Sequence, residues 1–167
     1  MTAADPETAF IEAMAPLFEG APRFLARLAD AGPFASDDEL FATARQIAHA
    51  MPEAEQIELI DAHPRLGAPP ASVSALSYTE QGYDRGAGTP DGGDMDTDVA
   101  AELERFNDAY EARQGFRYCV FVAGRPREAL LPELTTALDA DRHAEIHRAL
   151  DAVVDIAIDR HAKLSAT

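Results

Sequence analysis

Apolar side chains recur every three or four residues along most of this 167-residue chain, and this spacing constrains the fold more than any other feature. It is the period of a helix that turns one face toward a core. Since no strand-and-turn pattern repeats, we predict an all-α helical bundle. The length fits a single domain over residues 1–167. The clearest periodic stretches are Phe10–Phe18, Phe24–Leu28, Leu40–Ala48, Val99–Tyr110 and Ile146–Leu164.

The segment Phe116–Ala123 departs from this pattern, because its β-branched and aromatic side chains alternate as they do in a strand. A lone strand has no partner for its ladder hydrogen bonds. We therefore interpret the segment as a buried helix or as an extended wall between helices. Cys119 lies within it and is the only cysteine, so we expect a small buried apolar residue and no intrachain disulfide.

The chain is strongly acidic, with 30 acidic against 14 basic residues and a formal charge of −16. Such a charge repels phosphate backbones, so we predict no nucleic-acid partner. No apolar run approaches the roughly 18–20 residues that span a membrane. The N-terminal residues also lack the basic start and apolar stretch of a signal peptide. These features predict a protein of the cytoplasm with no membrane association.

His63 lies where a helix must end. The residues from Pro52 to Ala62 read as a helix, and Pro64 disfavours helical geometry for the residue before it. At a helix C-terminus the macrodipole favours the imidazolium by roughly 0.3–1 kcal/mol. Because histidine titrates near neutral pH, His63 is a candidate general acid. The alternative is a surface or capping histidine.

Ser77 and Glu80 have the spacing of a capping box, in which each side chain satisfies the other residue's backbone amide at a helix start. A helix N-terminus also offers free amides to a small carboxylate. In that case Glu80 would face a bound anion or the imidazole of His63.

His143 and His147 have the i, i+4 spacing of a zinc pair. The same helical stripe continues through Asp151, Asp155 and Asp159, which indicates a solvated helix face, and we predict no metal site there. Arg160 on the same predicted helix either points inward to bind an anion or lies in solvent. Asn107 presents a similar choice between a buried amide serving a pocket and an exposed one.

Several motifs occur together, and with them the chain resembles the OHCU decarboxylase family, which acts on 2-oxo-4-hydroxy-4-carboxy-5-ureidoimidazoline in ureide formation from urate. They follow the family's order at similar spacing over almost the whole chain. The motifs are His63-Pro64-Arg65-Leu66-Gly67, Ser77-x-x-Glu80-Gln81, Asn107-x-x-Tyr110, Gly115-Phe116-x-Tyr118 leading through Phe121-Val122 to Gly124-Arg125, then Glu145 and Ile156-Ala157-x-x-Arg160.

The resemblance implies an all-helical domain, usually a homodimer, that uses no metal or organic cofactor. It implies a carboxy-lyase that decarboxylates a small anionic substrate to (S)-allantoin in urate breakdown. His63 would be the general acid/base, and Glu80 would pair with it or with the substrate hydroxyl. Arg160 would meet the substrate anion, and the implied pocket residues are Pro64, Ser77, Gln81, Phe121, Val122, Ala123, Gly124 and Arg125.

The sequence departs from the family at Ala137 and Ala140, where an arginine and an asparagine are usual. If those side chains help to bind the substrate, Arg142, Arg125 or Arg127 must compensate. Two further function classes therefore stay open. One is a related lyase or decarboxylase for another small cyclic acid, and the other is a non-catalytic helical interaction domain.

Overall fold

The computed structural model describes residues 4–68, 70–82 and 97–166, and in this part of the chain every regular element is a helix. The predicted all-α class is therefore confirmed. The helices are α1 (Pro6–Met14), η1 (Ala15–Leu17), α2 (Pro22–Ala31), α3 (Asp37–Ala50), α4 (Glu53–Asp61), η2 (Pro70–Ser72), α5 (Ala75–Glu80), α6 (Thr97–Gln114), α7 (Arg127–Asp139) and α8 (Arg142–Ser165). None of the helices in the described ranges is long and apolar enough to cross a membrane.

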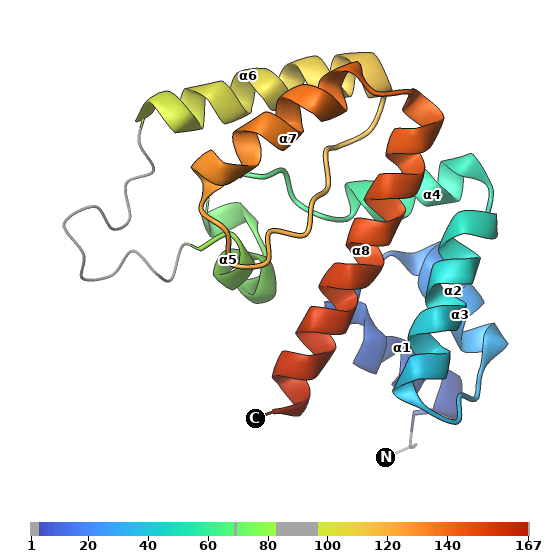
Figure 1. Cartoon of the computed structure of the whole chain (residues 1–167). Coiled ribbons are helices and arrows are strands. Elements are labelled where there is room, and N and C mark those ends of the chain that lie inside the picture. Colours follow the sequence, from blue (N-terminus) through green and yellow to red (C-terminus); the bar gives the residue numbers. More distant parts are fainter. Residues whose placement is uncertain (1–3, 69, 83–96, 167) are drawn as a thin grey trace. The chain divides into compact units, whose positions relative to one another are not determined.

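Two compact units divide the chain, and α8 begins in one and ends in the other (Figure 1). Unit 1 comprises Met1–His63 and Ile146–Thr167, and unit 2 comprises Pro64–Glu145. The division falls directly after His63, so the motif His63-Pro64-Arg65-Leu66-Gly67 contributes residues to both units.

Unit 1 is built on α2, which packs against α1, α3 and α4. The side chain of Ser36 accepts a hydrogen bond from the Glu39 amide and thereby begins α3, as expected of an N-cap serine. The predicted apolar faces are buried in this unit. Its most deeply buried side chains include Leu17, Phe18, Phe24, Leu25, Leu28, Ala44, Leu59, Ile60, Leu150, Val153 and Ala157.

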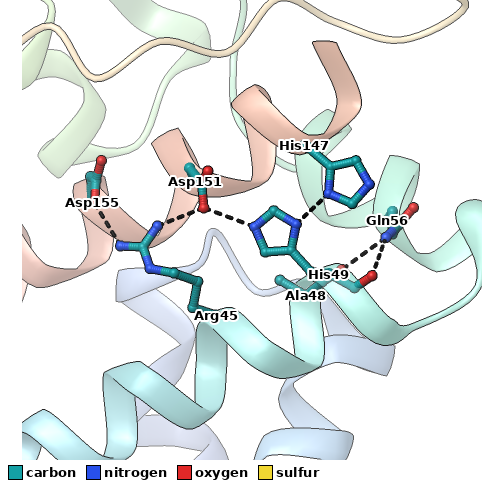
Figure 2. A network of polar contacts seen from close by, with 7 residues as sticks. All are labelled: Arg45, Ala48, His49, Gln56, His147, Asp151 and Asp155. Carbon is teal, nitrogen blue, oxygen red and sulfur yellow. Dashed lines mark hydrogen bonds and ion pairs between the residues drawn. The ribbon is translucent and has the colours of Figure 1, made fainter. Parts of the chain in front are cut away.

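Polar contacts join α3 to α8 within unit 1 (Figure 2). Arg45 donates to Asp151 and to Asp155, each at 2.7 Å. His49 lies 2.8 Å from the same Asp151 carboxylate through Nε2 and 2.5 Å from His147 through Nδ1. The side chains of Asp151 and Asp155 are still 48% and 47% exposed while they bind α3, so the prediction of a solvated face is confirmed in part.

Unit 2 contains α6 packed against α7 and the extended segment that follows α6. Gly115 ends α6 with a φ of +81°, in the left-handed region that glycine adopts without strain. The next residues are neither helix nor strand, and the Tyr118 ring stands 5.2 Å from both Phe106 and Tyr110. The extended wall is confirmed and the buried helix is wrong. Cys119 is buried, as predicted.

We predict that Asp151→Ala lowers the free energy of unfolding by about 1 kcal/mol, since this carboxylate accepts from both Arg45 and His49. Asp159→Ala is the matched control on the same helix, because Asp159 pairs with the exposed Lys163 and so with a residue of α8 itself. Asp159→Ala should lower the free energy of unfolding by less than about 0.5 kcal/mol. Urea unfolding measures both values, and equal losses would contradict the structural role of the α3–α8 contacts.

Candidate functional site

His63 lies two residues after the end of α4, as predicted from Pro64. Its backbone N–H donates to the Ile60 carbonyl at 3.1 Å. Its side-chain Nδ1 is 3.2 Å from the Leu59 carbonyl oxygen. A carbonyl oxygen only accepts, so Nδ1 carries the hydrogen and, in the neutral ring, the lone pair is on Nε2. The backbone of α4 thus selects the tautomer of the imidazole.

The imidazole of His63 is 4% exposed, and burial is the main cause that lowers its pKa from 6.5 to about 4. The Arg160 guanidinium lowers this pKa further, whereas the Glu19 carboxylate opposes the change. The lowering corresponds to roughly 3 kcal/mol, which exceeds the 0.3–1 kcal/mol available from a helix macrodipole. His63 is therefore neutral at pH 7. The expectation that this helix end favours the imidazolium was wrong, because loss of hydration outweighs the dipole.

Arg160 points into unit 1, where its side chain is 1% exposed. One terminal nitrogen donates to the Pro16 carbonyl at 2.8 Å, and the other donates to Glu19 Oε1 at 2.9 Å. A buried guanidinium requires such partners, since an unpaired buried charge is costly. Of the two alternatives left by the sequence, the inward position is confirmed.

Glu19 is a residue that the sequence analysis missed. Its φ of +52° places a non-glycine residue in the left-handed region, at a cost of about 1–2 kcal/mol. Gly20 follows it with a φ of +73°, so the two residues form the turn between η1 and α2. The available signal was an acidic residue beside a glycine between two apolar helical stretches. We call His63, Arg160 and Glu19 the His63 cluster.

The His63 cluster combines a neutral base with an ion pair that is almost removed from water. Such a base can accept a proton, return it, and gain charge when a negative ligand arrives. Across the part of the chain that the structure describes, no three His, Cys, Asp or Glu side chains are grouped to hold a metal ion.

Ser77 and Glu80 lie in α5 of unit 2, but not as a capping box. Ser74 is the N-cap, and its side chain accepts from the Ser77 amide at 3.2 Å. Ser77 is therefore inside the helix and is 3% exposed, whereas Glu80 is the last residue of α5 and is half-buried. The capping-box prediction was wrong because a serine three residues earlier takes the cap position.

Gln81 follows Glu80 and binds the backbone directly after Pro64. Its Nε2 donates to the Arg65 carbonyl at 3.1 Å, and its Oε1 accepts from the Gly67 amide at 2.7 Å. Asn107 Nδ2 donates to the carbonyl of the intervening Leu66 at 3.0 Å. Asn107 is thus the buried amide that the sequence allowed, and it serves the chain after His63.

Arg125 and Arg127, considered above as compensating anion-binding residues, both donate to main-chain carbonyls. Arg125 binds the Val122 carbonyl at 3.0 Å and the Phe121 carbonyl at 2.8 Å. Arg127 binds the Gln81 carbonyl at 2.8 Å. These contacts hold the segment Phe121–Gly124 and the end of α5 in place.

The two alanine positions lie beside a buried glutamine. Gln114 donates to the carbonyls of Ala137 and Ala140 at 3.4 and 3.1 Å, and Arg142 donates to the Gln114 carbonyl at 2.8 Å. The end of α7 is therefore held through its backbone, without polar side chains at these two positions.

The structure brings His63 and Arg160 together in unit 1, with Glu19. The other predicted site residues belong to unit 2, and each is placed within that unit. They are Pro64, Ser77, Glu80, Gln81, Phe121, Val122, Ala123, Gly124 and Arg125. The pairing of His63 with Glu80 stays a prediction.

We expect the buried His63 to make folding sensitive to mild acid. Between pH 6.5 and about 4 the unfolded chain takes up a proton that the folded imidazole does not, so stability falls as pH falls. The difference in unfolding free energy between wild type and His63→Gln should change by roughly 3 kcal/mol over this interval. Urea unfolding at several pH values measures it. His161→Gln is the control, and parallel pH curves for wild type and His63→Gln would contradict the prediction.

Comparison with known proteins gives a consistent result. The family model described as OHCU decarboxylase matches residues 3–162. The 2-oxo-4-hydroxy-4-carboxy-5-ureidoimidazoline decarboxylase of Haloferax volcanii is 26% identical over 154 residues, covering 90% of this chain and 86% of that protein. The uric acid degradation bifunctional protein PucL of Bacillus subtilis is 29% identical over 148 residues, which cover 89% of this chain and 28% of PucL.

A solved structure shares the fold. It is the crystal structure of an OHCU decarboxylase in the presence of (S)-allantoin, with a TM-score of 0.71 at 21% identity, and the match covers 93% of this chain and 99% of that one. With the family model matching almost the whole sequence, the chain belongs to the OHCU decarboxylase family.

Proposed function

We propose that this protein decarboxylates 2-oxo-4-hydroxy-4-carboxy-5-ureidoimidazoline (OHCU) to (S)-allantoin in urate breakdown. Family membership over residues 3–162 is the observation that carries the proposal. Two further findings support it: the matching relatives are named for this decarboxylation and for uric acid degradation, and the solved structure of the same fold was obtained with (S)-allantoin.

The reaction breaks the bond between the ring carbon and its carboxylate and releases carbon dioxide. The electron pair of that bond forms a carbon–carbon double bond to the ureido-bearing carbon, which leaves an enol at the hydroxyl-bearing carbon. The imine electron pair moves to the ring nitrogen, which takes up one proton from solvent. The enol hydroxyl then loses its proton and becomes the carbonyl, while the neighbouring carbon that bears the ureido group gains a proton. Because the ring accepts the electron pair, we propose that no metal or organic cofactor is required. The protein has to orient the ring and move a proton.

His63 is the group that we propose moves this proton. Its lowered pKa keeps the imidazole neutral at pH 7, so Nε2 is ready to accept the hydroxyl proton. The imidazolium that forms then delivers the proton to carbon from one face, which accounts for a single stereoisomer. We propose Glu80 as the partner of His63 or of the substrate hydroxyl.

Arg160 is the cation that we propose meets the substrate anion. It is buried and lies beside His63, and its pairing with Glu19 keeps the guanidinium in one orientation. A fixed guanidinium offers a charge-assisted contact to a carboxylate without further loss of side-chain entropy.

We further propose that the protein is a homodimer of the cytoplasm. The resemblance to the family supports the dimer, and membership of a family of metabolic enzymes supports the location. Sedimentation of the purified chain tests whether it is a dimer.

The proposal predicts that the wild-type protein accelerates the decay of freshly generated OHCU and yields optically active (S)-allantoin, followed by circular dichroism. Exhaustive chelator treatment should leave the rate unchanged. His63→Asn should lower kcat by about 10²–10⁴-fold, the range of a general acid/base. His161→Asn is the matched histidine control and should keep wild-type activity. A folded His63→Asn protein with normal turnover would refute the role of His63.

Arg160→Lys tests the anion contact, because it keeps the charge but loses the planar fork that binds two partners at once. We expect KM for OHCU to rise about tenfold, in line with the loss of a charge-assisted hydrogen bond. Arg23→Lys is the control, since Arg23 forms an exposed pair with Glu58. An unchanged KM in a folded Arg160→Lys protein would show that Arg160 does not bind the anion.

A further inference from the structure

We propose that His49 and His147 form a histidine clasp between α3 and α8, in which two facing ring nitrogens share one hydrogen and which opens when both rings are protonated. Both residues belong to unit 1, and the inference does not depend on the proposed function. Helical spacing pairs His147 with His143, whereas the structure joins it to a histidine of another helix.

The two imidazoles meet edge to edge (Figure 2). His49 Nδ1 lies 2.5 Å from His147 Nδ1, the ring centroids are 4.7 Å apart, and the ring planes differ by 8°. This centroid distance is close to the longest that the nitrogen contact permits, so the rings lie nearly in one plane and their nitrogens point at each other. A zinc ion holds its nitrogen ligands at about 2.0–2.1 Å. Two nitrogens this close therefore leave room between them for a hydrogen and not for a metal ion.

Asp151 decides which ring supplies that hydrogen. Its Oδ1 lies 2.8 Å from His49 Nε2 and accepts from Arg45 at 2.7 Å. Burial raises the pKa of the Asp151 carboxyl, but the hydrogen bonds from His49 and Arg45 outweigh burial and lower this pKa below its usual value. An ionised carboxylate only accepts, so His49 Nε2 carries a hydrogen and, in the neutral ring, Nδ1 holds the lone pair. The shared hydrogen therefore comes from His147 Nδ1.

Acid disturbs this order because the facing nitrogens can hold one hydrogen and not two. A first proton can leave the shared hydrogen in place, since a charged ring still donates through Nδ1 to the neutral ring. Once both rings are protonated, the contact has two donors and no acceptor, and the two positive rings repel each other. The His49 side chain is 26% exposed, so protons reach the clasp from solvent.

The neighbouring groups limit the opening to one end of the α3–α8 contact. Arg45 of α3 binds Asp151 and Asp155 of α8, each at 2.7 Å, and a guanidinium stays protonated in proteins. From α4, Gln56 contributes an uncharged amide that donates to the His49 carbonyl at 3.2 Å. Acid should therefore separate the two rings while the Arg45 pairs still hold α3 against α8.

The test replaces His147 with phenylalanine, which keeps a flat ring but can neither donate nor accept a hydrogen bond. In acid the unfolded chain takes up a proton on each histidine, whereas the closed clasp takes up only one, so acid weakens wild type relative to His147→Phe. We expect the ratio of the variant's unfolding constant to that of wild type to fall about fivefold between pH 8 and pH 5. This corresponds to one net hydrogen bond of roughly 1 kcal/mol. Urea unfolding measures the ratio, and the effect of His63 cancels because both proteins contain it.

His161→Phe is the matched control, because His161 also joins α8 to α3 but faces a carboxylate, that of Asp37, at 3.0 Å. Protonation strengthens a contact between histidine and a carboxylate, so the same ratio for His161→Phe should rise in acid. A ratio for His147→Phe that stays constant or rises would overturn the clasp.

A measurement on the wild-type protein keeps the test valid if the variant folds poorly. With ¹⁵N-labelled histidine, NMR coupling across the hydrogen bond should join the Nδ1 nuclei of His49 and His147 at pH 8. The coupling should vanish in acid, once both ring signals report the imidazolium form. Its absence at pH 8, or its persistence after both rings are protonated, would also overturn the clasp.

Discussion

The ion pair between Arg160 and Glu19 is the interaction on which unit 1 and its chemistry depend. It joins the last helix to the turn after η1, with a guanidinium that is 1% exposed. Removing one partner of such a pair leaves a buried charge and costs about 3–5 kcal/mol. The backbone strain at Glu19 is tolerated because the same residue supplies the counter-charge. Folding of this unit therefore fixes a cation beside His63.

That cation adds to the effect of burial on the protonation of His63. Burial and Arg160 lower the pKa of the His63 imidazole, whereas Glu19 raises it. The net result is an imidazole that is neutral at pH 7. A neutral imidazole with a fixed tautomer is a base that accepts one proton and returns it. An arriving anion adds negative charge to a resting cluster in which Arg160 and Glu19 already balance each other, so anion binding favours proton acceptance by His63.

Much of the fold could be predicted from the sequence, because the helices bury one periodic face and Pro64 ends α4. The cap of α5 could not, since Ser74 and Ser77 both fit a cap and only the packing selects Ser74. The charge state of His63 was also out of reach, because it depends on burial in the folded unit and on Arg160, which is distant in the sequence. The pairing of Glu19 with Arg160 and the contacts of the Gln81 side chain with the backbone could not be predicted either, because both join residues that only the folded chain brings together.

The protonation of His63 is the most direct test of this account. The chain has five histidines, so ¹³C-labelled imidazole signals can be followed by NMR through a pH titration, with His63→Asn assigning the signal of interest. The account predicts a pKa of about 4 for His63 in the wild type, and a rise toward 6.5 when Arg160→Gln removes the neighbouring cation. A wild-type His63 that titrates near 6.5 would contradict it.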